Sequence, residues 1–99
     1  MAVIDVLIVG TNRPIMATIE RLINREGIWV ATTAFSTDEA VACFLAKDFK
    51  LILLCAGLDD ELVLQEKLRQ LQPKIPVVKH YGGGSGLLFA EIHEALRKR

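Results

Sequence analysis

The 99-residue sequence has only two cysteines, three prolines and 6% aromatic residues, and its acidic and basic side chains balance to zero net charge. Two cysteines cannot form a disulfide framework, and neither Cys43 nor Cys55 has a histidine at metal-ligand spacing. Because the charges balance, the protein has no net positive electrostatic potential to attract a polyanion, and we expect no nucleic-acid partner. The apolar runs are broken well before the roughly 20 residues of a membrane span, and no secretory signal is recognisable. We therefore expect a cytoplasmic protein without membrane attachment.

Apolar residues, in contrast, are abundant. They make up 52% of the chain, which is enough for one continuous core at this length. No linker, repeat or low-complexity stretch divides the sequence, because the glycine-rich run near residue 84 is too short to separate two folding units. We therefore expect a single domain over residues 1–99.

Two kinds of apolar segment alternate along the chain, and they predict four strand–helix units. The expected strands are 3–9, 28–34, 51–55 and 75–78, and the expected helices are 14–26, 37–47, 59–71 and 85–98. Short loops between alternating strands and helices imply right-handed crossovers, which place helices on both faces of a parallel sheet. The predicted fold class is α/β, a three-layer doubly wound sandwich.

One apolar stripe on each expected helix should face the sheet. The residues expected on or near these stripes are Ile15, Ile19, Leu22 and Ile23, then Ala40, Val41, Phe44 and Leu45, then Leu62, Leu64, Leu68 and Leu71, and finally Leu88, Phe89, Ile92 and Leu96.

The first half of the chain also carries a series of short motifs at characteristic spacing. They are V-L-I-V-G-T-N-R-P at 6–14, T-A at 33–34, D-E-A at 38–40 and K-L-I-L-L-C at 50–55. With these motifs the segment 6–55 resembles the first half of a response-regulator receiver (CheY-like) domain, the flavodoxin-like module of two-component signalling. The resemblance implies a sheet in the order 2-1-3-4, with four strands or with five, since the chain is one strand–helix unit shorter than the family.

The resemblance also implies that a chemical activity has been lost. The family binds magnesium through two acidic residues after its first strand and accepts a phosphoryl group on an aspartate ending its third. This chain has Gly10 and Thr11 at the first place and Cys55 at the second. Magnesium requires hard oxygen ligands and an acyl phosphate requires a carboxylate, so we expect a non-phosphorylatable pseudo-receiver. Lys79 can be aligned with either of two places in the family. One is the lysine that follows the fifth strand, and the other is the segment at the end of the fourth strand.

The glycine-rich Gly82–Gly86 loop before the last helix offers backbone N–H groups, a helix N-terminus and a hydroxyl, which together suit a small anion or nucleotide. The candidate binding residues are Lys79, His80, Gly82, Gly83, Gly84 and Ser85. The alternative is a plain connection capped by Ser85, because the loop fits neither the P-loop nor the dinucleotide fingerprint.

Cys55 is a further candidate, since it ends a strand just before a helix. Asp59 and Asp60 oppose a thiolate there and no C-x-x-C partner follows, so a packed, inert cysteine is favoured over a catalytic one.

No catalytic residue, metal or cofactor is assigned, and we expect no enzyme. The leading hypothesis is a module that binds another protein, with a homodimer as one form, because an open sheet edge invites pairing. An anion or nucleotide sensor and a thiol enzyme are the alternatives.

Overall fold

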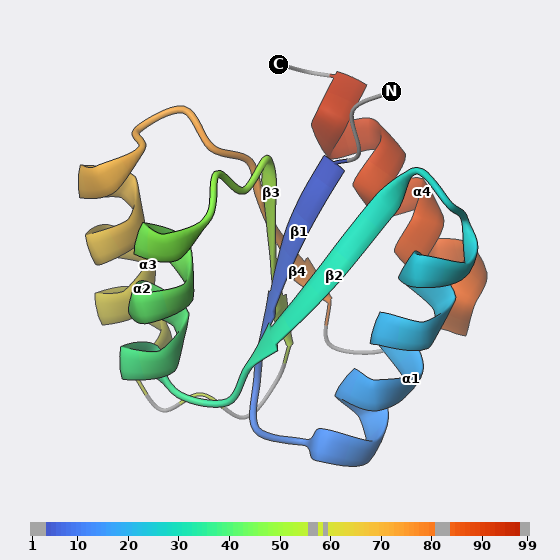
Figure 1. Ribbon diagram of the computed structural model, residues 1–99, viewed down its shortest axis with the longest axis horizontal. Coiled ribbons are helices and arrows are strands. Elements are labelled where there is room, and N and C mark those ends of the chain that lie inside the picture. The colour runs from blue at the N-terminus through green and yellow to red at the C-terminus, as the bar shows by residue number, and fades with distance from the viewer. Residues whose placement is uncertain (1–3, 56–57, 59, 81–83, 98–99) are drawn as a thin grey trace.

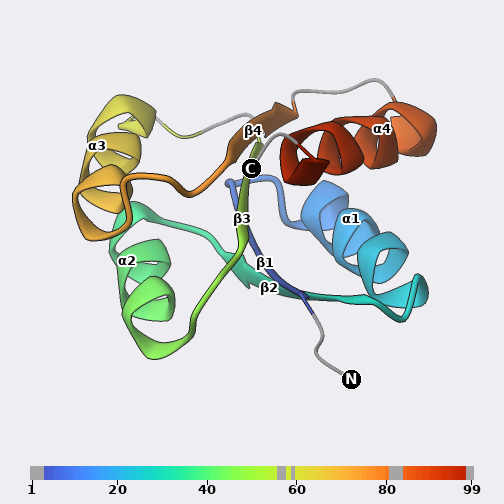
Figure 2. The same ribbon diagram turned by 90° about the horizontal axis from the view of Figure 1, so that it is seen from above.

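The computed structural model describes residues 4–55, 58, 60–80 and 84–97. The elements are β1 (Ile4–Val9), α1 (Arg13–Arg25), β2 (Trp29–Ala34), α2 (Thr37–Ala46), β3 (Leu51–Cys55), α3 (Glu61–Leu71), β4 (Val77–His80) and α4 (Gly84–Arg97). All strand pairs are parallel, and the sheet order is β2-β1-β3-β4. Helices α1 and α4 cover one face and α2 and α3 the other (Figures 1 and 2). The predicted three-layer sandwich and strand order are confirmed, with four strands among the described residues.

Local sequence signals set the helix starts. The side chain of Asn12 caps α1 by accepting a hydrogen bond from the Ile15 N–H at 3.1 Å, and a proline occupies the first turn. Ser36 caps α2 by accepting from the Glu39 N–H at 3.1 Å, while the Glu39 carboxylate accepts from the Phe35 N–H at 2.8 Å. This reciprocal capping satisfies backbone donors that a helix start otherwise leaves unpaired.

The core consists of two apolar layers, one on each side of the central strands β1 and β3. Residues 6–9 and 51–54 are fully buried, because these two strands are covered on both faces. One layer is completed by Met16, Ile19 and Ile23 of α1 with Leu88 and Ile92 of α4. The other is completed by Ala40 and Phe44 of α2 with Leu64 and Leu68 of α3.

Four predicted core residues are instead exposed, namely Ile15, Leu45, Leu62 and Leu71. Leu62 illustrates the reason, since it is 76% exposed although Leu64, two positions later, is buried. Two residues correspond to roughly 200° of helical rotation, so both side chains cannot face the sheet. Leu45 follows the buried Phe44 by a single residue and is likewise turned away. The apolar stripes are therefore narrower than the sequence predicts.

The fourth strand lies two residues later than predicted, at 77–80 instead of 75–78. Ile75 is buried but belongs to a turn, where its N–H donates to the Gln72 carbonyl at 3.2 Å. The strand continues through Lys79 and His80, which the apolar pattern alone does not include. A polar residue is tolerated here because β4 is an edge strand, and because His80 has a polar partner on α4.

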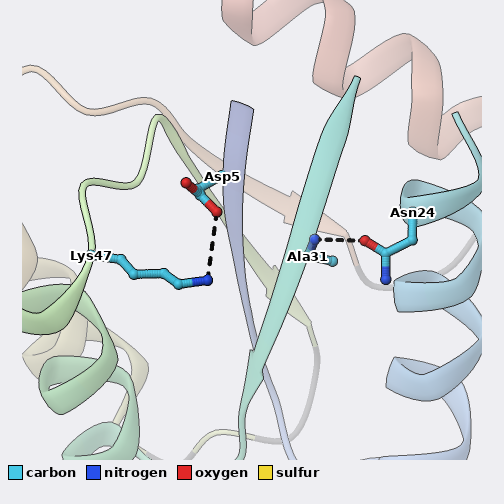
Figure 3. Close-up of polar contacts among 4 residues, drawn as sticks. All are labelled: Asp5, Asn24, Ala31 and Lys47. Atoms are coloured by element: carbon cyan, nitrogen blue, oxygen red, sulfur yellow. Dashed lines mark hydrogen bonds and ion pairs between the residues drawn. The ribbon is translucent and has the colours of Figure 1, made fainter. Parts of the chain in front are cut away.

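The outer edge of β2, at the opposite side of the sheet, is partly covered by a side chain. The Ala31 N–H donates to Asn24 Oδ1 at 2.9 Å, so a side chain of α1 satisfies one backbone donor of this edge strand (Figure 3).

Asp5 of β1 forms an ion pair with Lys47, with 3.7 Å between Oδ1 and Nζ (Figure 3). Within the part of the chain that the structure describes, no helix is long and apolar enough to cross a membrane.

Candidate functional site

The carboxyl ends of the four strands lie side by side at one end of the sheet, at the bottom of Figure 1. Ligands of doubly wound sheets bind beyond these strand ends. Gly10 lies directly after β1, where it is buried and its N–H donates to the Ala34 carbonyl at 3.2 Å. Thr11 is exposed beside it. Gly10 and Thr11, which the receiver resemblance aligns with the family's acidic pair, therefore present backbone and a hydroxyl, and no carboxylate.

Cys55 ends β3 and is only 3% exposed, within the apolar layer shared with α1 and α4. Burial raises the pKa of its thiol from 9.0 to about 11, because a thiolate would lose its hydration. At neutral pH the group is therefore an uncharged thiol, which is neither a nucleophile nor a magnesium ligand. The prediction of a packed cysteine is confirmed for Cys55, whereas Cys43 is only half-buried.

Among the residues that the structure describes near this end of the sheet, the charges are not arranged to hold a cation. The Arg13 guanidinium stacks on the Phe35 ring, 3.9 Å from its centroid, and so places a positive charge near the ends of β1 and β2. Asp5 lies in the amino-terminal half of β1, away from the site, and pairs there with Lys47 (Figure 3). Asp60 precedes α3 and makes no capping hydrogen bond, and Asp59 lies outside the described residues. Among the described residues no three histidine, cysteine or acidic side chains gather as a metal site.

Lys79 and His80, both predicted as anion ligands, are adjacent on β4 but interact with opposite layers. Lys79 Nζ lies 3.5 Å from Glu61 Oε2 of α3, and His80 Nδ1 lies 2.7 Å from Glu91 Oε1 of α4. Each basic group is thus already paired with a carboxylate. The structure does not bring these two side chains together as one anion cradle.

The remaining predicted anion ligands lie at the start of α4. Gly84 and Ser85 occupy its first turn, whereas Gly82 and Gly83 lie outside the described residues. The anion or nucleotide site therefore stays a prediction. A concentration-dependent rise in melting temperature with phosphate or nucleotides is its direct test.

Glu91 is a site residue that the sequence did not reveal. Its carboxylate contacts a ring eleven positions earlier in the chain, across the connection between β4 and α4. Helical spacing alone places Glu91 on the polar side of an amphipathic helix. Only the position of α4 over β4 brings it to His80 (Figure 2).

No family model matches the sequence, and no curated protein matches it either. Solved structures do match. A two-component response regulator from Clostridium difficile superposes with a TM-score of 0.83 at 16% identity, over 96% of this chain and 97% of that one. The fold is that of a response-regulator receiver domain. NtrX from Brucella abortus gives a TM-score of 0.85 at 21% identity, and the match covers 99% of this receiver-like chain but 27% of that longer chain.

A third match involves a protein complex. The crystal structure of histidine kinase ThkA with the response regulator TrrA, a protein known from Thermotoga maritima, contains a chain with a TM-score of 0.72 at 18% identity. The match covers 96% of this chain and 97% of that chain. At these identities the comparisons establish the receiver fold alone.

Proposed function

We propose that this chain is a cytoplasmic, non-phosphorylatable receiver-like module of signalling that acts by binding another protein. The observation that carries the proposal is the composition of the strand ends. The acceptor position holds a buried thiol with a pKa of about 11, and the metal positions hold Gly10 and Thr11. Without carboxylates there, neither magnesium binding nor acyl phosphate formation has a chemical basis.

The open edge of β4 supports the protein-binding role. The Pro76 carbonyl accepts a hydrogen bond from the Ile52 N–H at 3.0 Å, so this residue faces β3. Backbone groups alternate in direction along a strand, and Val77 and Lys79 therefore direct theirs away from the sheet. Outward-facing backbone N–H and C=O groups on an edge strand are a template to which another strand can pair. The opposite edge is less open, because Asn24 already binds the Ala31 N–H.

A groove of about 540 Å³ runs along this edge between β4 and α4. It is lined by Lys74, Pro76, Val77, Val78, Lys79, Glu91, Glu94 and Ala95. Both charge signs are present, so a twofold axis through the edge would place lysines of one copy near glutamates of the other. A second copy of the chain is therefore the first partner to test. The complex of TrrA with ThkA provides a precedent for a receiver-fold chain bound to another protein.

Substituting Lys79 tests this edge without disturbing the ladder to β3. Lys79→Pro removes an outward backbone donor together with the ion pair to Glu61, whereas Lys79→Ala removes the ion pair alone. We expect the alanine variant to self-associate somewhat more weakly than the wild type in sedimentation equilibrium, because a groove lysine is lost, and the proline variant to associate at least tenfold more weakly than the alanine variant. Equal association of all three proteins, or a monomeric wild type at millimolar concentration, would contradict pairing through β4. Matching circular dichroism spectra of the two variants would establish that both are folded.

A further inference from the structure

His80 lines a second groove, which lies on the other face of the sheet between α1 and α4. This groove has a volume of about 340 Å³. Among the described residues it is lined by Pro14, Ile15, Thr18, Ile19, Leu22, His80 and Leu88, of which Thr18 and His80 have polar side chains. His80 is 7% exposed, so it forms part of the inner surface of the groove. The groove is at the lower end of the size range of small-molecule sites and is mainly apolar, as such sites are.

The hydrogen bonds around this groove define the chemistry that it offers. His80 Nδ1 lies 2.7 Å from a Glu91 carboxylate oxygen, and a carboxylate only accepts, so Nδ1 is the protonated nitrogen. In the neutral ring Nε2 is then an acceptor, and no partner for it is seen within the described residues. The Thr18 hydroxyl donates to the Pro14 carbonyl at 3.1 Å, which leaves its oxygen lone pairs available. With a neutral His80 ring, the two polar side chains both present acceptors.

We propose that this groove binds a small apolar molecule bearing one hydroxyl group, an alcohol or a phenol, which donates its hydrogen bond to His80 Nε2. The apolar side chains of the groove would hold the apolar body of the ligand, and the hydroxyl would donate to the ring acceptor. Glu91 acts as a positioning residue, because it fixes the tautomer of the ring and its orientation. Its negative charge behind the imidazole disfavours an anionic ligand. This inference goes beyond the protein-binding role and does not depend on it.

Three matched probes test the chemistry of the groove by ¹⁹F NMR titration. 4-Fluorophenol, 4-fluorotoluene and 4-fluorobenzoate have similar shapes but present a donor, a methyl group and an anion. We expect the phenol to bind about tenfold more tightly than either of the other probes, since one net hydrogen bond is worth up to about a factor of ten. The methyl resonances of Ile15, Ile19 and Leu88 should shift during this titration. Equal affinities, no binding at millimolar concentration or shifts elsewhere would overturn the proposal.

Variants assign the effect to the acceptor. His80→Phe retains an aromatic ring and removes Nε2, so we expect it to lower phenol affinity about tenfold and leave 4-fluorotoluene affinity unchanged. Thr18→Val, on the exposed part of α1, removes the other polar side chain of the groove but leaves Nε2 in place, so it should leave phenol affinity nearly unchanged. Arg21→Gln, at an exposed position of α1 that lines neither groove, is the control and should have no effect. Unchanged phenol binding in the His80 variant, or an equal loss in the Thr18 variant, would overturn the assignment, as would groove resonances that shift on dilution and so reveal a second copy there.

Discussion

At pH 7 the thiol of Cys55 is expected to react with iodoacetamide about 100-fold more slowly than a cysteine of ordinary pKa. The reacting species is the thiolate, and burial raises the pKa of this thiol from 9.0 to about 11, which lowers the thiolate fraction about 100-fold. The side chain is also only 3% exposed, which restricts access of the reagent. Alkylation followed by intact mass in a Cys43→Ser background measures the rate. A rate equal to that of the denatured chain would contradict the inert assignment and revive a thiol enzyme.

The same shift in pKa affects stability in a defined direction. The folded state holds the proton more tightly than the unfolded state, so the stabilisation is complete below pH 9 and is lost as the pH rises towards 11. The free energy of unfolding should therefore fall more steeply between these values in the wild type than in Cys55→Ala. Parallel curves for the two proteins would show that the thiol is not desolvated.

Replacing Leu53 by alanine is expected to lower the free energy of unfolding by about 3 kcal/mol, as is typical for truncation of a fully buried leucine. Leu53 lies in the central strand β3, is 0% exposed and packs in the layer beneath α1 and α4. A domain of this size is typically stable by only about 5–15 kcal/mol, so the melting temperature should fall by more than roughly 10 °C. Urea denaturation monitored by circular dichroism measures the change.

Leu62→Ala is the matched control for Leu53→Ala. The chemical change is identical, but Leu62 is 76% exposed on α3 and should alter stability by no more than about 0.5 kcal/mol. Similar losses of unfolding free energy in both variants would contradict the exposed position of Leu62. They would mean that Leu62 is buried in the folded chain or in an associated form of it.

The order and type of the elements were predictable from the sequence because buried parallel strands and amphipathic helices have distinct apolar periods. The run at 51–55 is apolar throughout, and β3 spans the predicted residues. β4 was misplaced because half of it is polar, and its position depends on pairing with β3 rather than on its own composition. Exposure of Leu62 and Leu45 was not predictable either, since a run of apolar residues does not specify where a helix contacts the sheet.

The candidate site was predictable in part. Gly10, Thr11 and Cys55 are found at the strand ends, because the motifs that carry the receiver resemblance fix their positions in the chain. The partners of Lys79 and His80 were not predictable, since Glu61 and Glu91 belong to helices on opposite faces. The stacking of Arg13 on Phe35 also joins segments that only the fold brings together.

Incubation with acetyl phosphate and Mg²⁺, followed by intact-mass spectrometry, tests the central claim most directly. A receiver that retains its aspartate, treated in parallel, shows that the donor is competent. We predict no phosphorylated species of this chain, because its strand ends offer a glycine, a threonine and an uncharged thiol where carboxylates are needed. An aspartyl or cysteinyl phosphate would contradict that claim.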